Sequence, residues 1–259
     1  MSDVKYTVSS HYNGEIKIKF YPGKHGFQLE GHRDYLLGVT SCTGVVDKSV
    51  PLLIWAGRLT RDFILDQIKK GNPVTELMLE EAIRQHQVKK EQAADIGHMV
   101  HAWAEDYIAG KNPVVPEDIN VRNGVLGFLK LVKEHKPRFL FSEKVVYSRE
   151  HNFVGIADGA MTLESEDHKV RHLIDWKTSK SVYMEMYMQV AAYEAALKEE
   201  FGYEEWGDKF IFRLDKESGE FESHRIPQAD HDRYFAGFLS CLKLRKMVKQ
   251  WDIDHPWRK

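Results

Sequence analysis

Two neighbouring apolar segments each carry an acid near the middle, and this feature constrains the fold more than any other. The stretch from residue 155 to 180 reads GIADGAMTLESEDHKVRHLIDWKTSK. Asp158 lies in the first apolar segment and Asp175 in the second, and Lys177 follows two residues later. Charged side chains are rarely fully buried unless they are paired. The segments therefore predict two strands whose acids have a functional role.

The alternation of side chains along a strand divides the second segment into two faces. Asp175 and Lys177 fall on one face, whereas Ile174 and Trp176 fall on the other. We expect the apolar face to pack into a core and the charged face to line a site.

The connecting turn sets the expected register. If the hairpin is symmetric about Glu166 and Asp167, Asp158 lies directly opposite Asp175. Like charges in that position are destabilising, so a positive group must compensate them. Lys177 is one candidate, and a divalent cation is the better one because Mg²⁺ prefers carboxylate oxygens.

A plainer interpretation of the hairpin stays open. The two strands could face solvent with hydrated charges, and a slip of one residue would put the acids on opposite faces. The glycines on either side of Asp158, Gly155 and Gly159, favour the first interpretation because they indicate a backbone that another group approaches closely.

Composition narrows the class of protein. The chain has 259 residues, enough for one large domain, with 42% hydrophobic and 29% charged residues. Its formal net charge is −2 and its pI about 6.7, so a nucleic-acid partner would need a local basic groove. The two cysteines, Cys42 and Cys241, exclude a disulfide framework and a four-cysteine iron–sulfur cluster. Without a signal peptide or an apolar run of about 20 residues, the expected location is cytoplasmic, with no membrane partner.

The order of periodic segments predicts an α/β protein with a central mixed sheet flanked by helices. We expect a single domain over 1–259, made of an N-terminal hairpin and loop (1–50), a helical region (51–136) and a catalytic sheet with closing helices (137–259). Within it, the patterns predict a hairpin in 14–37 and a loop over 38–49; helices near 51–71, 75–110, 117–135, 182–200 and 229–250; and strands near 138–150, 153–164, 170–179, 208–214 and 220–226.

Four motifs in order resemble the PD-(D/E)XK nuclease superfamily. GIADG followed by IDWKTSK is similar to its D…(D/E)-x-K core, here with Asp in place of the common Glu. GHMVHAWAE resembles the G-x-x-x-H-x-x-x-E helix of the RecB-like exonuclease branch, and QVAAY its Q-x-x-x-Y helix. GVTSCTGVVDKSVPLLIWA looks like a segment of exonucleases similar to the mitochondrial genome-maintenance enzyme. The chain lacks the iron–sulfur cysteines found in some members, including CRISPR-associated exonucleases.

The resemblance implies a restriction-endonuclease-like core and a set of site residues. Asp158 and Asp175 would hold one or two Mg²⁺ or Mn²⁺ ions, and Lys177 would position the attacking water. The further implied ligands are His101, the main-chain carbonyl of Trp176 and Glu143. Gln189 and Tyr193 would orient the nucleic-acid backbone. Glu105 would orient His101 or a metal-bound water.

Each assignment has an ordinary structural alternative. A histidine in a helix is commonly a partly buried one with satisfied hydrogen bonds, and His98 competes with His101. Glu143 could simply pair with Lys144 on its strand. Gln189 and Tyr193 lie four residues apart, as residues of an amphipathic packing face also do.

The resemblance also implies DNA as partner, single-stranded or with a free end. In related exonucleases, helices before the catalytic strands form an arch over the site. The basic residues expected there to contact DNA are Arg58, Arg61, Arg84, Lys89 and Lys90, with Trp55 and Trp103 as stacking or core aromatics. Because the chain has no Walker A motif, a helicase or recombination partner would be a separate chain.

The leading functional hypothesis is a metal-dependent exonuclease of DNA recombination, repair or replication, of a kind that would suit a phage or a bacterium. The alternatives are a structure-selective endonuclease of the same superfamily, a catalytically silent nucleic-acid-binding subunit, and an unrelated sheet protein with coincidental motifs.

Overall fold

The computed structural model describes residues 5–164, 170–202 and 206–256. Its strands are β1 (Thr7–His11), β2 (Ile16–Tyr21), β3 (Gly26–Leu29), β4 (Leu37–Gly38), β5 (Pro137–Ser148), β6 (Phe153–Leu163), β7 (His172–Lys177), β8 (Lys209–Leu214) and β9 (Phe221–Ile226). Its helices are α1 (Val39–Thr43), α2 (Ser49–Lys69), α3 (Glu76–Ile108), α4 (Ile119–His135), α5 (Met184–Phe201) and α6 (His231–Asp254).

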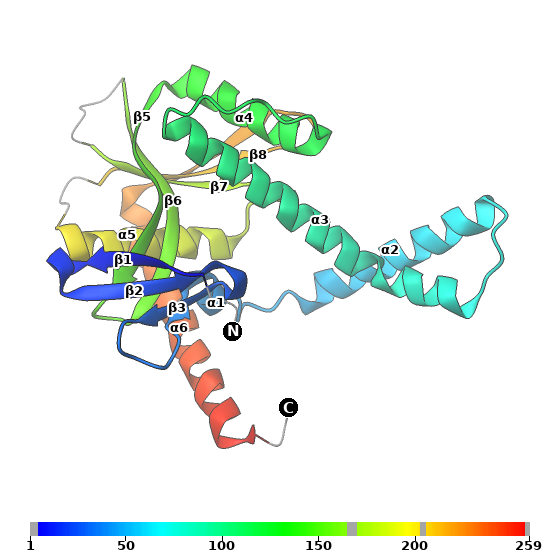
Figure 1. The fold of residues 1–259 in the computed structure, drawn as a ribbon, viewed down its shortest axis with the longest axis horizontal. Helices are drawn as coiled ribbons and strands as arrows, with labels where there is room; N and C mark the ends of the chain where they lie inside the picture. The colour runs from blue at the N-terminus through cyan, green and yellow to red at the C-terminus, as the bar shows by residue number, and fades with distance from the viewer. Residues whose placement is uncertain (1–4, 165–169, 203–205, 257–259) are drawn as a thin grey trace.

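The main sheet is mixed and has β6 at its centre (Figure 1). Strand β5 pairs antiparallel along the length of β6, while β4 and β7 both pair with β6 as well. The order continues through β8, parallel to β7, to β9 at the edge. The expected mixed α/β architecture, with a mixed sheet flanked by helices, is confirmed.

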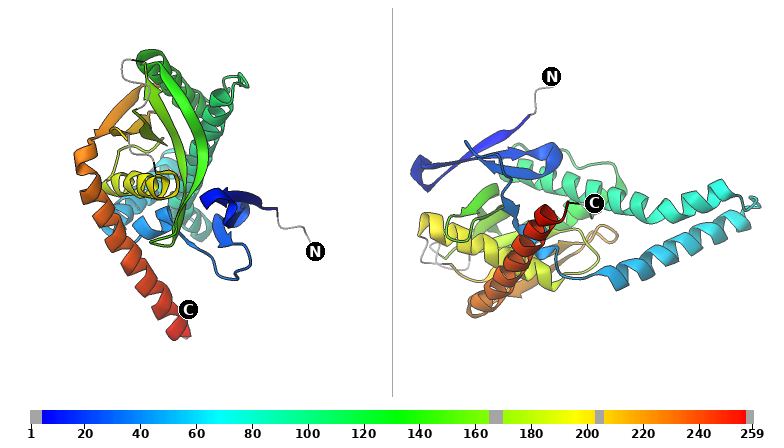
Figure 2. Two further views of the ribbon diagram at one scale, coloured as in Figure 1. Left: turned by 90° about the vertical axis from the view of Figure 1, so that its left-hand side faces the viewer. Right: turned by 90° about the horizontal axis from the view of Figure 1, so that it is seen from below.

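Helices cover the two faces of this sheet in separate cores (Figures 1 and 2). Helices α1, α5 and α6 pack on one face, where Leu173 of β7 is fully buried. Helices α3 and α4 pack on the other face, around Ile174 and Trp176. The alternation predicted for β7 is therefore confirmed: its apolar face enters the core under α3 and α4, and Asp175 lies on the α5 face.

A separate sheet of β1, β2 and β3 precedes the main one. The expected hairpin forms between β2 and β3, and its turn is the short helix Pro22–Lys24. Strand β1 is an addition that the sequence patterns did not predict. The expected loop over 38–49 is wrong in part, because Val39–Thr43 form α1 and bury Val39 and Cys42 against the main core.

Helices α2 and α3 pack together as a hairpin that projects from the body of the protein (Figures 1 and 2). None of the residues of α2 is fully buried. Helix α3 is continuous over 33 residues, so its first turns lie in the projection and its last turns pack on the sheet. Within the described residues, no helix has the length and apolar character that a membrane crossing requires.

Candidate metal centre and active site

The pairing of β6 with β7 follows the predicted register. Its pairs include Gly159 with Ile174 and Ala160 with Leu173. Continued by one step, this register puts Asp158 opposite Asp175. The two strands are also joined at this point by a hydrogen bond from the Trp176 N–H to Oδ2 of Asp158, 2.9 Å long. The turn residues Glu166 and Asp167, on which the prediction was centred, lie outside the described residues.

Asp175 is the most deeply placed acid of the site, with 0% of its surface exposed. Lys177 Nζ lies 2.5 Å from Oδ2 of Asp175 and 3.9 Å from Oδ2 of Asp158. The Oδ1 atom of Asp175 accepts no hydrogen bond from any described residue. Burial raises the pKa of Asp175 to about 7, because Lys177 only partly offsets the burial and Asp158 adds to it.

Glu143 reaches the same place from β5 with an unusual backbone. Its φ is +47°, in the left-handed region that side chains other than glycine rarely adopt. The flanking pairs, Ser142 with Gly159 and Lys144 with Ala157, bracket it opposite Asp158. A non-glycine residue held in this region costs about 1–2 kcal/mol, and such strain clusters at functional sites.

His101 reaches the site from α3, and its side chain is about 25% exposed. Its Nδ1 atom lies 3.5 Å from Oε1 of Glu143 and 3.8 Å from Oδ2 of Asp158. Burial acts to lower the pKa of His101, but the two carboxylates outweigh it and the pKa is raised. His98, the alternative on the next turn, is exposed and stacks on His25 instead.

A glycine lets α3 come this close to the sheet. A Cβ atom on Gly97 would lie 3.2 Å from the Thr178 hydroxyl, in the loop after β7. Since His101 follows one turn later, this contact fixes the depth at which the imidazole enters the site. The glycine of the G-x-x-x-H pattern thus has a steric reason in this chain.

These side chains fit a divalent cation. His101, Glu143 and Asp158 each offer a ligand atom, and the three atoms lie within 4.8 Å of one another. Asp175 does not belong to this group. Its Oδ1 accepts no hydrogen bond from any described residue, and Lys177 Nζ lies between the two acids, 2.5 Å from Asp175 Oδ2 and 3.9 Å from Asp158 Oδ2. Carboxylate oxygens with one imidazole nitrogen suit Mg²⁺ or Mn²⁺. For Trp176 the described contact is that of its N–H, so a carbonyl ligand stays a prediction.

Gln189 and Tyr193 project from α5 toward the acids. Both are buried, and Gln189 Nε2 donates a 2.7 Å hydrogen bond to the Tyr193 hydroxyl. Burial raises the pKa of Tyr193, and Asp175 and Asp158 raise it further. A Cβ atom on Gly155 would lie only 2.4 Å from the Tyr193 ring. The close approach predicted at this glycine therefore exists, and the approaching group is Tyr193.

Other sequence-predicted residues lie apart from this group. Glu105 is exposed, and its described neighbour is Lys111, whose pKa it helps to raise; no contact with His101 is found among the described residues. Trp103 is buried in the core, where its Nε1–H donates to the Val114 carbonyl. The five basic residues are all exposed on the projecting hairpin: Arg58, Arg61, Arg84, Lys89 and Lys90.

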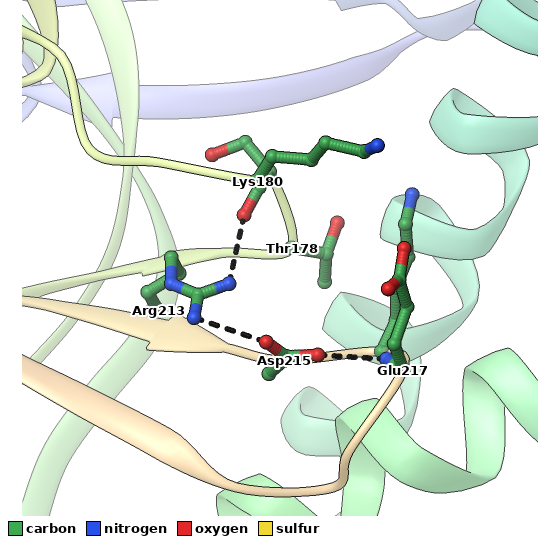
Figure 3. Close-up of a pocket in the computed structure, with 7 residues that line it drawn as sticks. Thr178, Lys180, Arg213, Asp215 and Glu217 are labelled. Carbon is green, nitrogen blue, oxygen red and sulfur yellow. Dashed lines mark hydrogen bonds and ion pairs between the residues drawn. The ribbon is translucent and has the colours of Figure 1, made fainter.

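A polar cleft beside Lys177 was missed by the sequence reasoning (Figure 3). Its volume is about 200 Å³, and it lies between the loop after β7 and the turn after β8. Thr178, Lys180, Arg213 and Lys216 contribute to its walls. The KTSK run directly after Asp175 and Trp176 was the available signal.

No protein-family model matches the chain, and no curated protein matches it either.

Proposed function

We propose that this protein is a metal-dependent deoxyribonuclease, and specifically an exonuclease that acts on single-stranded DNA or on DNA ends. The observation that supports this most is the convergence of His101, Glu143 and Asp158 beside the buried Asp175–Lys177 pair. Such a concentration of acids around an incompletely satisfied carboxylate is costly without a cation. The order of the motifs adds the resemblance to RecB-like exonucleases.

We assign a separate role in the proposed reaction to each group of site residues. His101, Glu143, Asp158 and Asp175 would hold the cation, which supplies Lewis acidity to a phosphodiester group when bound. Burial opposes the charge of Lys177, but Asp175 and Asp158 outweigh it and its pKa is raised. We therefore assign Lys177 to orienting water and offsetting the charge that develops on the phosphate.

The Gln189–Tyr193 pair has a positioning role in this proposal. The Tyr193 hydroxyl accepts a hydrogen bond from Gln189, so its own proton is free to be donated toward the acids or a phosphate oxygen. Its raised pKa keeps that proton in place at neutral pH. The proposed setting is reducing and cytoplasmic, which two free thiols, Cys42 and Cys241, support.

Digestion of matched linear and circular single-stranded DNA tests the proposal. Wild-type protein is incubated with each substrate in Mg²⁺, Mn²⁺ or EDTA, beside Asp175→Ala and Lys177→Ala. Asp232→Ala and Lys133→Ala remove exposed charges elsewhere and serve as matched controls. We expect metal-dependent loss of the linear strand, at least 10³-fold slower in the two site variants and unchanged in the controls.

Each other outcome has a defined meaning. Cutting of the circular strand identifies an endonuclease of the same superfamily. Binding of both DNAs without cutting in any metal identifies a silent binding subunit. Cleavage that persists in Asp175→Ala and Lys177→Ala assigns the activity to a contaminant and rejects this site.

A further inference from the structure

The polar cleft beside Lys177 stands at the carboxyl ends of two parallel strands. Lys177 of β7 pairs with Arg213 of β8, and the loops that follow both strands form the cleft. In α/β sheets with parallel strands, ligands commonly bind outside the carboxyl ends of the strands. Thr178, which follows Lys177, also touches α3 at Gly97, one turn before His101. The cleft therefore begins at the residue after Lys177, although none of the candidate metal ligands lines it.

The charges of the cleft separate into a paired set and an unpaired set. Arg213 is held by Glu222 and by Asp215, whose Oδ2 lies 3.0 Å from Nη2. The Oδ1 atom of Asp215 accepts from the N–H groups of Glu217 and Ser218. Arg213 and Asp215 thus form a fixed frame, visible in Figure 3.

The side chains left over are Lys180, Lys216, the Thr178 hydroxyl and one acid, Glu217; the first three are suited to an anion. Lys180 and Lys216 form no described ion pair, and the Thr178 hydroxyl lies between their loops and α3. In Figure 3 the Lys180 side chain extends past Thr178, on the side of the cleft away from the Arg213–Asp215 pair. Ammonium and hydroxyl groups are common phosphate ligands.

We infer that Lys180, Lys216 and Thr178 bind the DNA phosphate that is adjacent to the one being cleaved. This inference rests on the proposed function, because it places a strand across His101 and Lys177. The cleft would hold that strand in register, whereas the paired Arg213 acts only as a support for the two loops.

Single-position charge removal in the DNA tests this subsite. Oligonucleotides carry one neutral methylphosphonate linkage at successive positions, and binding is measured in Ca²⁺ at several salt concentrations. The variants are Lys180→Ala/Lys216→Ala and a control of equal charge, Lys5→Ala/Lys133→Ala, whose lysines are exposed elsewhere. We expect wild type and control to lose about tenfold in affinity when the linkage next to the scissile one is neutral.

The variant Lys180→Ala/Lys216→Ala should bind DNA without a methylphosphonate about tenfold more weakly than wild type. Its affinity should not change further when the linkage next to the scissile one is neutral. Its salt dependence should decrease by about 0.7 in slope, the value for one lost phosphate contact on a single strand. An unchanged response to the neutral linkage overturns the subsite while leaving the nuclease proposal intact. Absence of binding and cleavage in wild type itself counts against both.

A second, independent observation concerns the outer half of α6. This part of the helix projects from the body (Figures 1 and 2). Leu244, Met247, Val248 and Trp251 are spaced as one helical stripe, and each is between 37% and 61% exposed. Lys246 and Lys249 lie on the other side of the helix, where both are exposed and donate to main-chain carbonyls of the body.

The charges that flank the stripe are arranged for self-pairing. Lys243 and Arg245 lie at its start, where Arg245 also donates to the Ser41 hydroxyl, and Asp252 and Asp254 lie at its end. In an antiparallel pair of these helices centred near Val248, the basic residues of one copy lie close to the acidic residues of the other copy. A parallel pair would place like charges together. We propose that α6 forms this antiparallel contact with a second copy of the chain.

The stripe is only two turns long, whereas a stable interface buries about 800 Å² on each partner. We therefore expect a weak dimer that depends on concentration. Sedimentation velocity between about 1 and 200 µM measures it. Trp251→Glu should abolish the dimer, and Asp252→Lys/Asp254→Lys should weaken it at least tenfold.

Adding Lys243→Asp/Arg245→Asp to the acid-to-lysine variant reverses all four charges and should restore the dimer. Exposed Leu77→Glu on α3 serves as a control that should leave it unchanged. A monomer at every concentration, or a dimer that Trp251→Glu leaves intact, overturns the proposal. Because the stripe is exposed, circular dichroism should show every variant folded.

Discussion

Asp175 and Glu194 are both fully buried carboxylates, yet their surroundings have opposite effects. Glu194 on α5 is held by Lys209 at 2.5 Å, Lys198 at 2.7 Å and His231 at 3.1 Å. Although burial acts to raise its pKa, these partners lower it to about 2. Asp175 has one cation beside it, a second carboxylate nearby, and a pKa raised to about 7.

The comparison separates a structural ion network from a ligand site. Around Glu194, two lysines and a histidine from three elements lie against the acid and together lower its pKa, although its Oε2 accepts no hydrogen bond of ordinary geometry from a described residue. Around Asp175 and Asp158 the positive charge within the chain is insufficient, which is the condition under which a buried acid is costly. Burial alone therefore does not identify a site; a buried acid with too few partners does.

Removal of the Glu194 carboxylate should have the largest effect on stability and is the strongest test of its structural role. Glu194→Ala leaves the fully buried Lys209 without its partner, so we expect the free energy of unfolding to decrease by about 3–5 kcal/mol. Urea denaturation followed by circular dichroism measures it. A loss below 1 kcal/mol would mean that the network contributes little. Lys198→Ala, at the more exposed edge, is the milder control.

A bound cation should stabilise the folded protein through the acids around Asp175. The ion pairs around Glu194 should make no contribution to this stabilisation. At a free Mn²⁺ concentration of about 100 times Kd, binding to the folded state adds about 2.7 kcal/mol. We expect an increase in Tm for wild type and for Glu194→Gln, and none for Asp158→Ala. An equal increase in Asp158→Ala would place the cation elsewhere.

The two clusters should respond to pH in opposite directions. Asp175 has a folded pKa above its unfolded value, so its contribution to stability is complete below about pH 4 and is lost as the pH rises through 7. Glu194 has a folded pKa below its unfolded value, so its contribution is present above about pH 4.5 and is lost as the pH falls toward 2.

Without metal, the stability difference between wild type and Asp175→Asn should therefore change by about 2 kcal/mol between pH 5 and pH 8, in favour of the variant at high pH. Denaturation at each pH measures the difference. The same comparison for Glu194→Gln should be flat over that range. A flat result for Asp175→Asn would show that its carboxyl titrates normally.

The smallest expected effect concerns Glu143. Glu143→Gly relieves the backbone at φ +47° and should raise the free energy of unfolding by about 1 kcal/mol, while it removes a ligand and slows cleavage. Glu143→Gln keeps the strained backbone and should show the loss of activity without the gain in stability. A destabilised glycine variant would mean that contacts of the Glu143 side chain contribute more to stability than the backbone strain costs.

The sequence predicted the register of the central hairpin because alternation, turn symmetry and two misplaced acids all agreed. The helix α3 and the face of β7 also followed from periodicity. What it could not predict depends on contacts between distant segments. The left-handed backbone at Glu143 lies between two regular pairs with β6 and has no signal in the sequence, and α1 forms because Val39 and Cys42 find a core between α5 and α6.

The cleft at Lys180 shows the same limit. Its walls come from two loops that are neighbours only because β7 and β8 run parallel. The sequence patterns predicted a strand up to residue 179, whereas β7 ends at Lys177 and the residues after it form a loop beside Arg213 and Asp215. Residue types alone pointed to the proposed metal ligands, whereas the cleft next to Lys177 could be recognised only from the sheet topology.

The unbroken α3 gives the metal centre a mechanical connection to the projecting hairpin. At 1.5 Å per residue the helix is about 50 Å long, and Gly97 lies against Thr178 about two thirds of the way along it. His101 lies about 6 Å beyond that fulcrum, while Glu76 lies about 32 Å before it. Val100, Trp103 and Ala104 anchor the turns around His101 in the core, so a rigid tilt about Gly97 would have to move this core as well. By this lever geometry, a displacement of the tip would be reduced roughly fivefold at the imidazole.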